Sequence, residues 1–265
     1  MKTKEEILEI VEKHHNIAIN YMNRRKGTVV MTVLVGSQNY GLEHEGSDVD
    51  TYSFVLPPLG EIASVRDPVA TEVELRDGKC CIKDIRVALN LLIKTNPNSV
   101  EWFCSDYVVY NPMYEQLLKR YINEKTRDKF LYCDIFQMGN ACAGMSCQLK
   151  NRNMPVGKKF SHALRVRDMW TSYLCGETEN ILKFREEETR KRALAAKLSE
   201  NEEYQKLSEE VSNDIADSVA KLKELDQEAL VKINQQMSAN KEYVGFLQYL
   251  ILAKHCALEL AKSYE

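Results

Sequence analysis

The sequence predicts an α+β protein in which a small mixed β-sheet core with flanking helices is followed by an all-helical domain. Two observations lead to this fold class. Up to about residue 110, short β-branched or apolar runs alternate with amphipathic stretches, as strands and helices of a mixed sheet do. From about residue 113 to the end, apolar residues recur every three or four positions, which is the helical period. We therefore expect two domains, residues 1–125 and residues 126–265.

The first elements follow from apolar periodicity and from chain-breaking residues. Residues 4–23 carry an apolar stripe at helical spacing, and Gly27 ends that helix. Residues 29–35 are almost all apolar, which predicts a buried strand. A second strand is expected over residues 50–56, where Pro57 stops it.

The next segments lead from the sheet into helices. Residues 80–87 are expected to form a short strand that continues into a helix over residues 85–95, whose apolar side chains fall on one stripe. Asn98 and, three positions later, Glu101 fit a capping box at the start of a further helix. Because capping accounts for both polar side chains, we interpret Asn98 and Glu101 as structural.

The second domain is expected to contain several amphipathic helices. Small residues are frequent over residues 130–150, which favours close packing between helices. Pro155 and Gly157 break the chain before a helix that begins near Lys158. Residues 184–240 are highly charged with apolar positions three or four apart, which predicts one long amphipathic helix or a hairpin. The apolar stretch that follows is expected to be a buried helix.

Two acidic residues at the start of the second predicted strand, Asp48 and Asp50, are the most informative pair in the chain. Side chains at i and i+2 of a strand share a face, with Cα atoms roughly 6–7 Å apart. Such a pair can converge on divalent ions, as phosphoryl and nucleotidyl transfer requires. Gly36 and Ser37 end the preceding strand in a turn whose N–H groups and hydroxyl can approach a phosphate. The two features are expected to meet at one edge of the sheet.

These motifs resemble a known signature. The run Gly-Ser-Gln-Asn-Tyr-Gly-Leu that begins at Gly36, with the Ser-Asp-Val-Asp run that ends at Asp50, resembles DNA polymerase β-like nucleotidyltransferases. Within that superfamily the chain is most similar to predicted bacterial and phage nucleotidyltransferases associated with RNA repair. The resemblance implies that Gly36 and Ser37 hold the triphosphate of a nucleotide, and that Asp48 and Asp50 bind two Mg²⁺ (or Mn²⁺) ions. It also implies a third carboxylate on a later strand.

Asp84 is the candidate for this third carboxylate. Asp84, the apolar run after it and the Asn-Pro-Asn segment at residues 96–98 resemble the corresponding family segment. The resemblance implies that Asp84 completes the metal site and helps to activate the attacking hydroxyl. The alternative is that Asp84 caps the helix it precedes, a favoured place for aspartate. Glu72 and Glu74 in the strand-like residues 71–75 are the rivals, unless they form the solvated face of an edge strand.

Lys158, His162 and Arg165 fall at i, i+4 and i+7 of a predicted helix, so they share one face. The run that contains them resembles the family's helical segment facing the nucleotide cleft. A cationic face over a triphosphate would stabilise negative charge in the transition state. The alternative is that Arg165 pairs with a carboxylate such as Asp168 or Glu177.

Composition limits the class of protein. Of the 265 residues, 28% are charged and 44% hydrophobic, as in ordinary globular proteins. No signal-peptide core or run of 18 apolar residues is evident, so we expect a cytoplasmic protein outside the membrane. The eight cysteines match no familiar zinc spacing, which favours reduced thiols. Among the histidines, His14, His15 and His44 are expected to be exposed and His255 to be satisfied in the core.

The sequence thus predicts a metal-dependent nucleotidyltransferase that moves a nucleoside monophosphate from a triphosphate such as ATP to an acceptor hydroxyl. The family's association with RNA repair favours an RNA 3′ end as the acceptor. The formal net charge of −3 fits a small nucleic-acid footprint and leaves nucleotidylation of a protein or a small molecule open. A third possibility is a binding or scaffolding protein on a degenerate transferase fold, against which the intact motifs argue.

Overall fold

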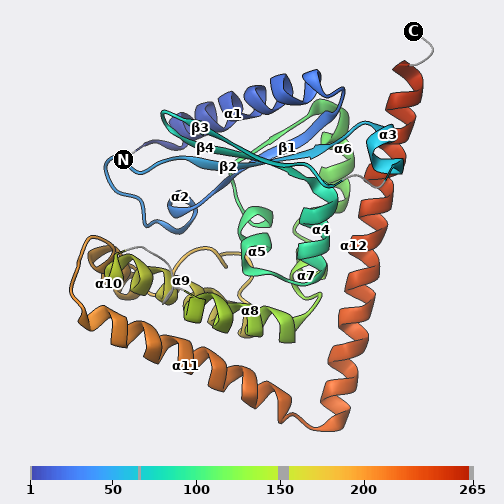
Figure 1. Cartoon of the computed structure of the whole chain (residues 1–265). Coiled ribbons are helices and arrows are strands. Elements are labelled where there is room, and N and C mark those ends of the chain that lie inside the picture. Colours follow the sequence, from blue (N-terminus) through green and yellow to red (C-terminus); the bar gives the residue numbers. More distant parts are fainter. Residues whose placement is uncertain (1, 65–66, 149–154, 263–265) are drawn as a thin grey trace.

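The computed structural model describes residues 2–64, 67–148 and 155–262, and it shows a mixed five-stranded sheet with helices on both faces (Figure 1). The strands are β1 (Thr28–Val35), β2 (Asp50–Leu56), β3 (Ala70–Leu75), β4 (Gly78–Asp84) and β5 (Val108–Tyr110). The helices around the sheet are α1 (Lys4–Arg24), α2 (Ser37–Tyr40), α3 (Leu59–Ala63), α4 (Ile85–Ile93), α5 (Pro97–Phe103), α6 (Pro112–Tyr121) and α7 (Arg127–Leu131). The helices that follow are α8 (Ile135–Gln148), α9 (Val156–Leu174), α10 (Glu187–Lys197), α11 (Glu203–Lys223) and α12 (Gln227–Lys262).

The sheet has the strand order β3-β4-β2-β1-β5. Strand β1 pairs antiparallel with β2 and β5, β2 pairs parallel with β4, and β3 pairs antiparallel with β4. Every residue of β1 is buried, because α1 covers one face of the sheet while α4 and α5 lie beneath the other (Figure 1). The predicted α+β fold class is confirmed.

A buried polar network lies between α1 and the sheet. His14 and His15 are buried, and their Nδ1 atoms lie 2.9 Å from the hydroxyls of Thr51 and Thr32, respectively. The expectation that both histidines are exposed is wrong, because the face of α1 that packs on the sheet includes polar as well as apolar positions. Burial lowers the pKa of both imidazoles. His255 lies in the core with both ring nitrogens in hydrogen-bond contact, as expected.

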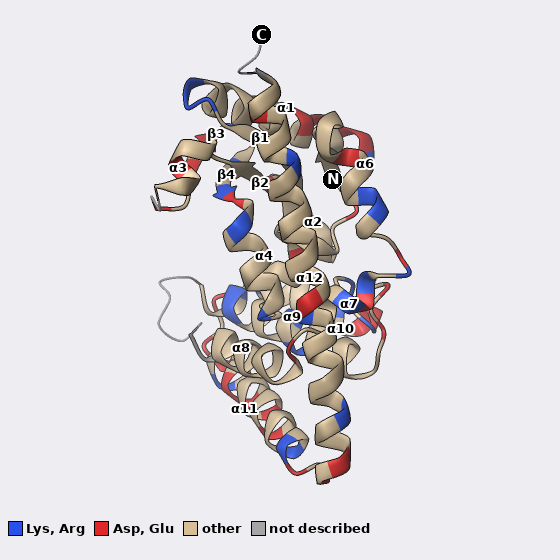
Figure 2. Ribbon diagram, turned by 90° about the vertical axis from the view of Figure 1, so that its right-hand side faces the viewer, with Lys and Arg blue, Asp and Glu red and all other residues tan. Residues whose placement is uncertain are grey.

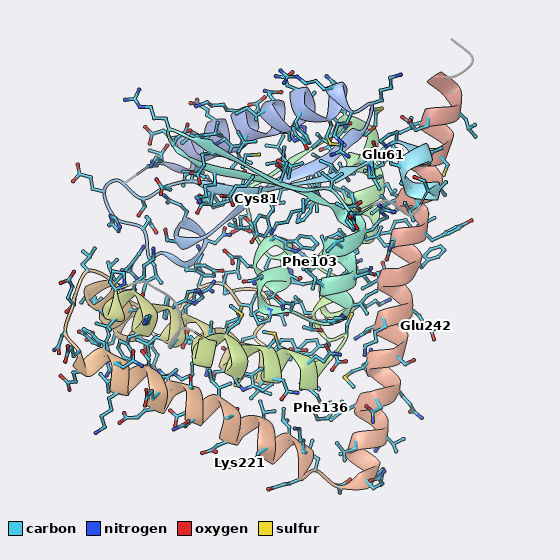
Figure 3. The ribbon with its side chains drawn as sticks, in the orientation of Figure 1. Glu61, Cys81, Phe103, Phe136, Lys221 and Glu242 are labelled. Atoms are coloured by element: carbon cyan, nitrogen blue, oxygen red, sulfur yellow. The ribbon has the colours of Figure 1, made fainter. Side chains whose placement is uncertain are left out.

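Helices α8 to α11 pack into a second buried cluster. The Trp170 indole N–H donates to the Ser218 hydroxyl at 2.7 Å, and an added Cβ at Gly139 would lie 2.8 Å from the same indole. The small residues of α8 therefore allow close helix packing, as the sequence predicts. Phe103 packs against both this cluster and the one beneath the sheet, with its ring centroid 4.8 Å from that of Phe130 (Figure 3).

Helix α12 closes the fold along one side. Val244, Leu247 and Ile251 bury one face of it in the cluster beneath the sheet, while Phe246 and Tyr249 are exposed. The helix has the length and composition of a membrane span, with 22% of its most apolar stretch buried, but these features also suit a helix packed on a globular core. The closing helix, expected to be buried, is thus buried on one side only. The charged residues 184–240, expected to form one long helix or a hairpin, instead form three segments: α10, α11 and the start of α12.

Candidate functional site

A cavity of about 530 Å³ lies where the edge of the sheet meets α9 and α10. All the residues predicted to bind nucleotide, and the predicted aspartate pair, line it: Gly36, Ser37, Asp48, Asp50, Lys158, His162 and Arg165. The wall also includes Tyr40, Tyr52, Glu101 and Lys197, which the sequence did not identify as site residues. Segments that are far apart in the sequence therefore meet at one place.

The turn between β3 and β4 holds the aspartate pair in position. The Val49 amide donates to the Asp77 carbonyl at 2.8 Å, and the Lys79 amide donates to Asp50 Oδ1 at 3.0 Å. Gly78 has φ +148°, and an added Cβ there would lie 2.2 Å from the Val49 carbonyl oxygen. Only glycine fits so close to the backbone between the two aspartates.

The aspartate pair carries negative charge that the protein does not neutralise. Burial raises the pKa of Asp50, the Lys79 amide opposes this shift, and the charge of Asp48 adds to it. Asp48 is exposed, and among the residues that the structure describes no Lys or Arg forms an ion pair with either carboxylate. Carboxylate oxygens are the ligands that Mg²⁺ prefers. The donor set and its excess charge therefore fit a divalent cation.

The turn after β1 presents Ser37 to the cavity, but the Gly36 amide is already taken. Gly36 has φ +94°, and its N–H donates to Glu101 Oε1. Asp50 lies on the other side of Gly36, with Oδ2 3.8 Å from the position of an added Cβ. In the described part of the chain, neither the amide nor the hydroxyl of Ser37 has a hydrogen-bond partner. Ser37, rather than the Gly36 amide, is therefore available to an anion.

Glu101 belongs to the site, contrary to its interpretation as a capping residue. The cap of α5 is Asn96, whose side chain accepts from the Asn98 amide at 3.0 Å, so the cap lies two residues before the predicted one. Glu101 is instead free to reach the Gly36 amide and the Arg165 guanidinium, which is 3.5 Å from Oε2. The signal for this assignment was Pro97, because proline is favoured at the first position of a helix.

Helix α9 supplies a cationic wall to the cavity, as its spacing predicts. Lys158 is exposed, His162 is half-buried, and Arg165 is buried with its guanidinium 4.0 Å from the ring centroid of Tyr40. The alternative partners of Arg165 are excluded, because Asp168 and Glu177 both bind Arg185. The positive charge of Arg165 is instead held at the cavity by Glu101.

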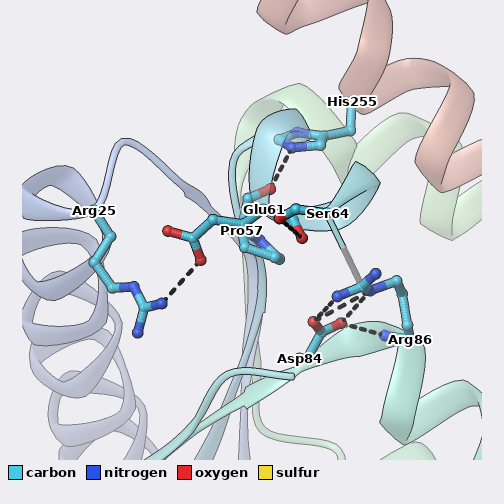
Figure 4. A network of polar contacts seen from close by, with 7 residues as sticks. All are labelled: Arg25, Pro57, Glu61, Ser64, Asp84, Arg86 and His255. Carbon is cyan, nitrogen blue, oxygen red and sulfur yellow. Dashed lines mark hydrogen bonds and ion pairs between the residues drawn. The ribbon is translucent and has the colours of Figure 1, made fainter. Parts of the chain in front are cut away.

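Asp84, the predicted third metal ligand, lies outside the cavity. It is in register with Val55 of β2, five residues from Asp50 and therefore on the opposite face, about 16 Å along the strand. Its buried carboxylate accepts the Arg86 amide at 2.9 Å as the cap of α4 and pairs with the Arg86 guanidinium at 2.6 Å (Figure 4). Asp84 is therefore the N-cap of α4, which is the alternative role that the sequence suggested.

The strand next to Asp50 offers no carboxylate on the face of the site. Cys81 is in register with Tyr52 and shares that face (Figure 3), and Lys79 flanks it. The rivals Glu72 and Glu74 lie one strand further out, where Lys79 pairs with both at 2.9 and 2.7 Å. Among the described residues, no third His, Cys, Asp or Glu joins Asp48 and Asp50 in a metal-binding group.

Comparisons with known proteins bear on this site. A family model described as the RNA repair pathway DNA polymerase beta family (RlaP) matches residues 2–239. No curated protein matches the chain. A crystal structure of a nucleotidyltransferase-like protein from Exiguobacterium sibiricum 255-15 aligns with 93% of this chain and 77% of its own, at 13% sequence identity and a TM-score of 0.30. At that score the structural likeness carries no argument, whereas the family match spans both the sheet and the helices that line the cavity.

Proposed function

Since the chain belongs to the RNA repair pathway DNA polymerase beta family, we propose that it is a metal-dependent nucleotidyltransferase acting on an RNA 3′ end. The observation that carries this proposal is the convergence of three features on one cavity. The Ser37 turn, the aspartate pair and the cationic wall of α9 all line the same space of about 530 Å³. A cavity of this size accommodates a nucleotide-sized ligand.

The proposed reaction is an in-line displacement at the α-phosphorus of a nucleoside triphosphate. A bond forms between the acceptor oxygen and phosphorus, the bond from phosphorus to the bridging oxygen breaks, and pyrophosphate leaves, while the proton of the acceptor hydroxyl passes to water. Asp48 and Asp50 would hold Mg²⁺, which when bound supplies positive charge beside the reacting phosphate. Ser37 would bind the phosphate chain, and Arg165 with Lys158 would stabilise the charge that develops on pyrophosphate.

Glu101 serves as a positioning residue in this proposal. It binds the Gly36 amide on one side and the Arg165 guanidinium on the other, so it fixes the phosphate turn relative to α9. Arg165 is also packed on Tyr40. A preorganised cation loses little freedom when the substrate binds, which favours stabilisation of the transition state.

The charge distribution supports an acceptor that contacts the protein over a short length. The net charge is −3, and the ribbon in Figure 2 shows acidic and basic residues mixed along α11 instead of a continuous basic stripe. A protein that binds a long phosphate backbone is usually basic. A strand terminus needs few phosphate contacts and is compatible with this surface.

One observation favours a second candidate, a nucleotide-binding protein that has lost transfer activity. No third carboxylate of the described residues joins the aspartate pair, and Glu101, the only other carboxylate that lines the cavity, is held by Arg165. This candidate predicts nucleotide binding without transfer, and nucleotidylation of a protein is a further outcome that the same experiment detects.

The test is label transfer from each α-labelled nucleoside triphosphate, with Mg²⁺ or Mn²⁺, to total RNA and total protein from a host lysate. Asp48→Asn and Asp50→Asn should abolish transfer while leaving the fold intact, because each removes one ligand charge. Glu74→Gln is the matched control, since Glu74 is an exposed carboxylate outside the cavity.

Label on RNA in the wild type and the control alone would support the proposal and identify the preferred base. Label on protein would replace the RNA acceptor by a protein hydroxyl. Nucleotide binding without any label would favour the second candidate. Full transfer by either aspartate variant would overturn the assignment of the aspartate pair.

A further inference from the structure

A half-buried lysine beside the cavity, Lys83, has no role in the proposed reaction. It belongs to β4, and its ammonium lies 3.4 Å from the centroid of the Tyr52 ring. Tyr52 lines the cavity, whereas Lys83 itself does not. The attraction between a cation and an aromatic face holds the ammonium at this place. The fold therefore fixes a positive charge next to the cavity.

The carboxylates whose charges act on Lys83 are already bound to other cations. Burial lowers the pKa of Lys83, and nearby acidic groups, Glu72 and Glu101 among them, oppose this shift. Lys79 pairs with Glu72 at 2.9 Å, and the Arg165 guanidinium is 3.5 Å from Glu101. Within the described part of the chain, the Lys83 ammonium forms no ion pair or hydrogen bond of its own. Its charge is thus available to an anion from outside the protein.

The order of the strands places Lys83 and the phosphate turn on opposite sides of the aspartate pair. Strand β2, which begins at Asp50, has β1 as one neighbour and β4 as the other. The turn that carries Ser37 follows β1, whereas Lys83 belongs to β4. Lys83 is in register with Phe54, so it lies on the same face of the sheet as Asp50 and Tyr52.

An in-line displacement requires the acceptor oxygen to attack from the side opposite the leaving group. In the proposed reaction Ser37 and the cationic wall of α9 bind the phosphates that leave, so the acceptor approaches from the β4 side. The cavity of about 530 Å³ accommodates one nucleotide-sized ligand, so the rest of an RNA strand lies outside it. The phosphate that precedes the terminal ribose of such a strand would therefore pass close to Lys83.

The segment that follows Lys83 would not repel a phosphate backbone. Residues 85–100, which form α4 and the start of α5, include basic residues but no Asp or Glu. Lys94 at the end of α4 is exposed and forms no ion pair with the described residues, and Asn98 is exposed where it lines the cavity. An RNA strand that leaves the cavity on this side meets no carboxylate from this segment.

We propose that Lys83 binds the phosphate that precedes the 3′-terminal ribose of the RNA acceptor, with Tyr52 as the positioning residue of its ammonium. This inference rests on the proposed function. It gives the acceptor a cation separate from those of α9, which face the nucleoside triphosphate. An acceptor without a phosphate at that place gains nothing from Lys83, so the contact favours a nucleic-acid end over a protein hydroxyl.

The test compares label transfer from the four α-labelled nucleoside triphosphates to two synthetic acceptors. One is a single-stranded oligoribonucleotide, and the other is the same strand with a neutral methylphosphonate as its last linkage. The wild type should use the neutral acceptor about tenfold less efficiently, as expected for one lost charge-assisted hydrogen bond. Lys83→Gln should lower kcat/KM for the natural acceptor by a similar factor and show no further loss with the neutral one. Lys83→Arg, which keeps the charge, should retain the preference.

Lys129→Gln is the matched control. The Lys129 ammonium also lies over a tyrosine ring, 4.5 Å from the centroid of Tyr243, but outside the cavity. This variant should prefer the natural acceptor as the wild type does. The ratio of the two rates within one variant does not depend on how much of the protein is folded. Calorimetric titration with ATP should give the same affinity for Lys83→Gln and the wild type, because Lys83 acts on the acceptor.

The outcomes separate this inference from the proposed function. A preference for the natural acceptor that the wild type and the control share and Lys83→Gln lacks would support the contact. A preference that persists in Lys83→Gln, or a wild type that uses both acceptors equally, would overturn the contact while leaving transfer to RNA in place. A wild type that labels neither oligonucleotide would overturn both.

Discussion

Asp50 and Asp84 stand at opposite ends of two parallel neighbouring strands, and they differ in burial and in the charges beside them. Asp50 opens β2 at the cavity, half-buried, with one amide donor and the like charge of Asp48 beside it. Asp84 ends β4 in full burial, with an amide donor and an arginine on its carboxylate. The first carboxylate is held in place without a counter-charge, and the second is neutralised by its own neighbour.

A compensating cation within the fold distinguishes a structural carboxylate from a candidate functional one. A buried carboxylate costs free energy unless a cation or hydrogen bonds compensate it. Arg86 compensates Asp84 within the fold, so Asp84 has no need of a ligand. No Lys or Arg in the described residues pairs with Asp50, so its compensation must come from solvent or from a bound cation.

The largest stability effect that tests this comparison is expected from Asp84→Asn. The substitution keeps a capping group but leaves the Arg86 guanidinium without its carboxylate, which should lower the free energy of unfolding by roughly 3 kcal/mol. Label transfer by the folded variant should stay at the wild-type level. Urea denaturation measures the first quantity, and Glu74→Gln, on the exposed edge strand, should change stability by less than about 0.5 kcal/mol.

An Asp84→Asn variant that folds as stably as the wild type and transfers no label would break the comparison. It would place Asp84 in the reaction, as the family resemblance implies, despite its position on the other face of the sheet.

A smaller effect is expected from Gly78→Ala, which acts on the Asp50 end alone. The added Cβ would lie 2.2 Å from the Val49 carbonyl oxygen at a backbone φ of +148°, so the turn must move away from the aspartate pair. We expect a loss of about 2 kcal/mol in unfolding free energy and a severalfold weaker Mg²⁺-dependent binding of nucleotide. Gly60→Ala in α3, where an added Cβ meets nothing within 4 Å, is the control; it should leave nucleotide binding unchanged and raise the unfolding free energy by up to about 1 kcal/mol, because alanine is favoured over glycine in a helix. If Gly78→Ala bound nucleotide normally, the turn would not be what positions the pair.

The parts of the site that the sequence predicted depend on local spacing. Asp48 lies two positions before Asp50, just ahead of β2 and not within a strand as expected, and the helical repeat places Lys158, His162 and Arg165 on one face. Both relations follow from spacing along the chain and do not depend on how distant segments pack. The family resemblance then joined these local patterns into one expected site, and the cavity lines all of them.

The parts that the sequence did not predict depend on register and on packing between distant segments. Asp84 could be assigned to the other face of the sheet only once Val55 was known to be its neighbour in the β2–β4 pair. Glu101 changed its role because the cap of α5 lies two residues earlier than the motif suggested. Lys197 reaches the cavity through the contact of α10 with Gly157, and no periodicity links α10 to α9.

The smallest predicted effect is a change in unfolding temperature, which should have opposite signs for Asp50→Asn and Asp84→Asn. Because burial and Asp48 raise the pKa of Asp50 in the folded protein, its charge destabilises the fold at neutral pH, and this cost disappears as the pH falls below the unfolded value of about 4. Asp50→Asn should therefore raise the unfolding temperature at pH 7 in the absence of metal, by roughly 1–3 °C, whereas Asp84→Asn lowers it. The gain over the wild type should shrink in acid.

Added Mg²⁺ should reverse the order, because it stabilises only a protein that binds it. The wild type should gain stability with Mg²⁺ concentration and overtake Asp50→Asn, whose unfolding temperature should not respond. Differential scanning calorimetry at pH 7, with EDTA and then with Mg²⁺, measures both steps. A lower unfolding temperature for Asp50→Asn in EDTA would mean that the fold itself compensates the charge of Asp50. Asp50 would then be a structural carboxylate like Asp84, and the comparison between them would fail.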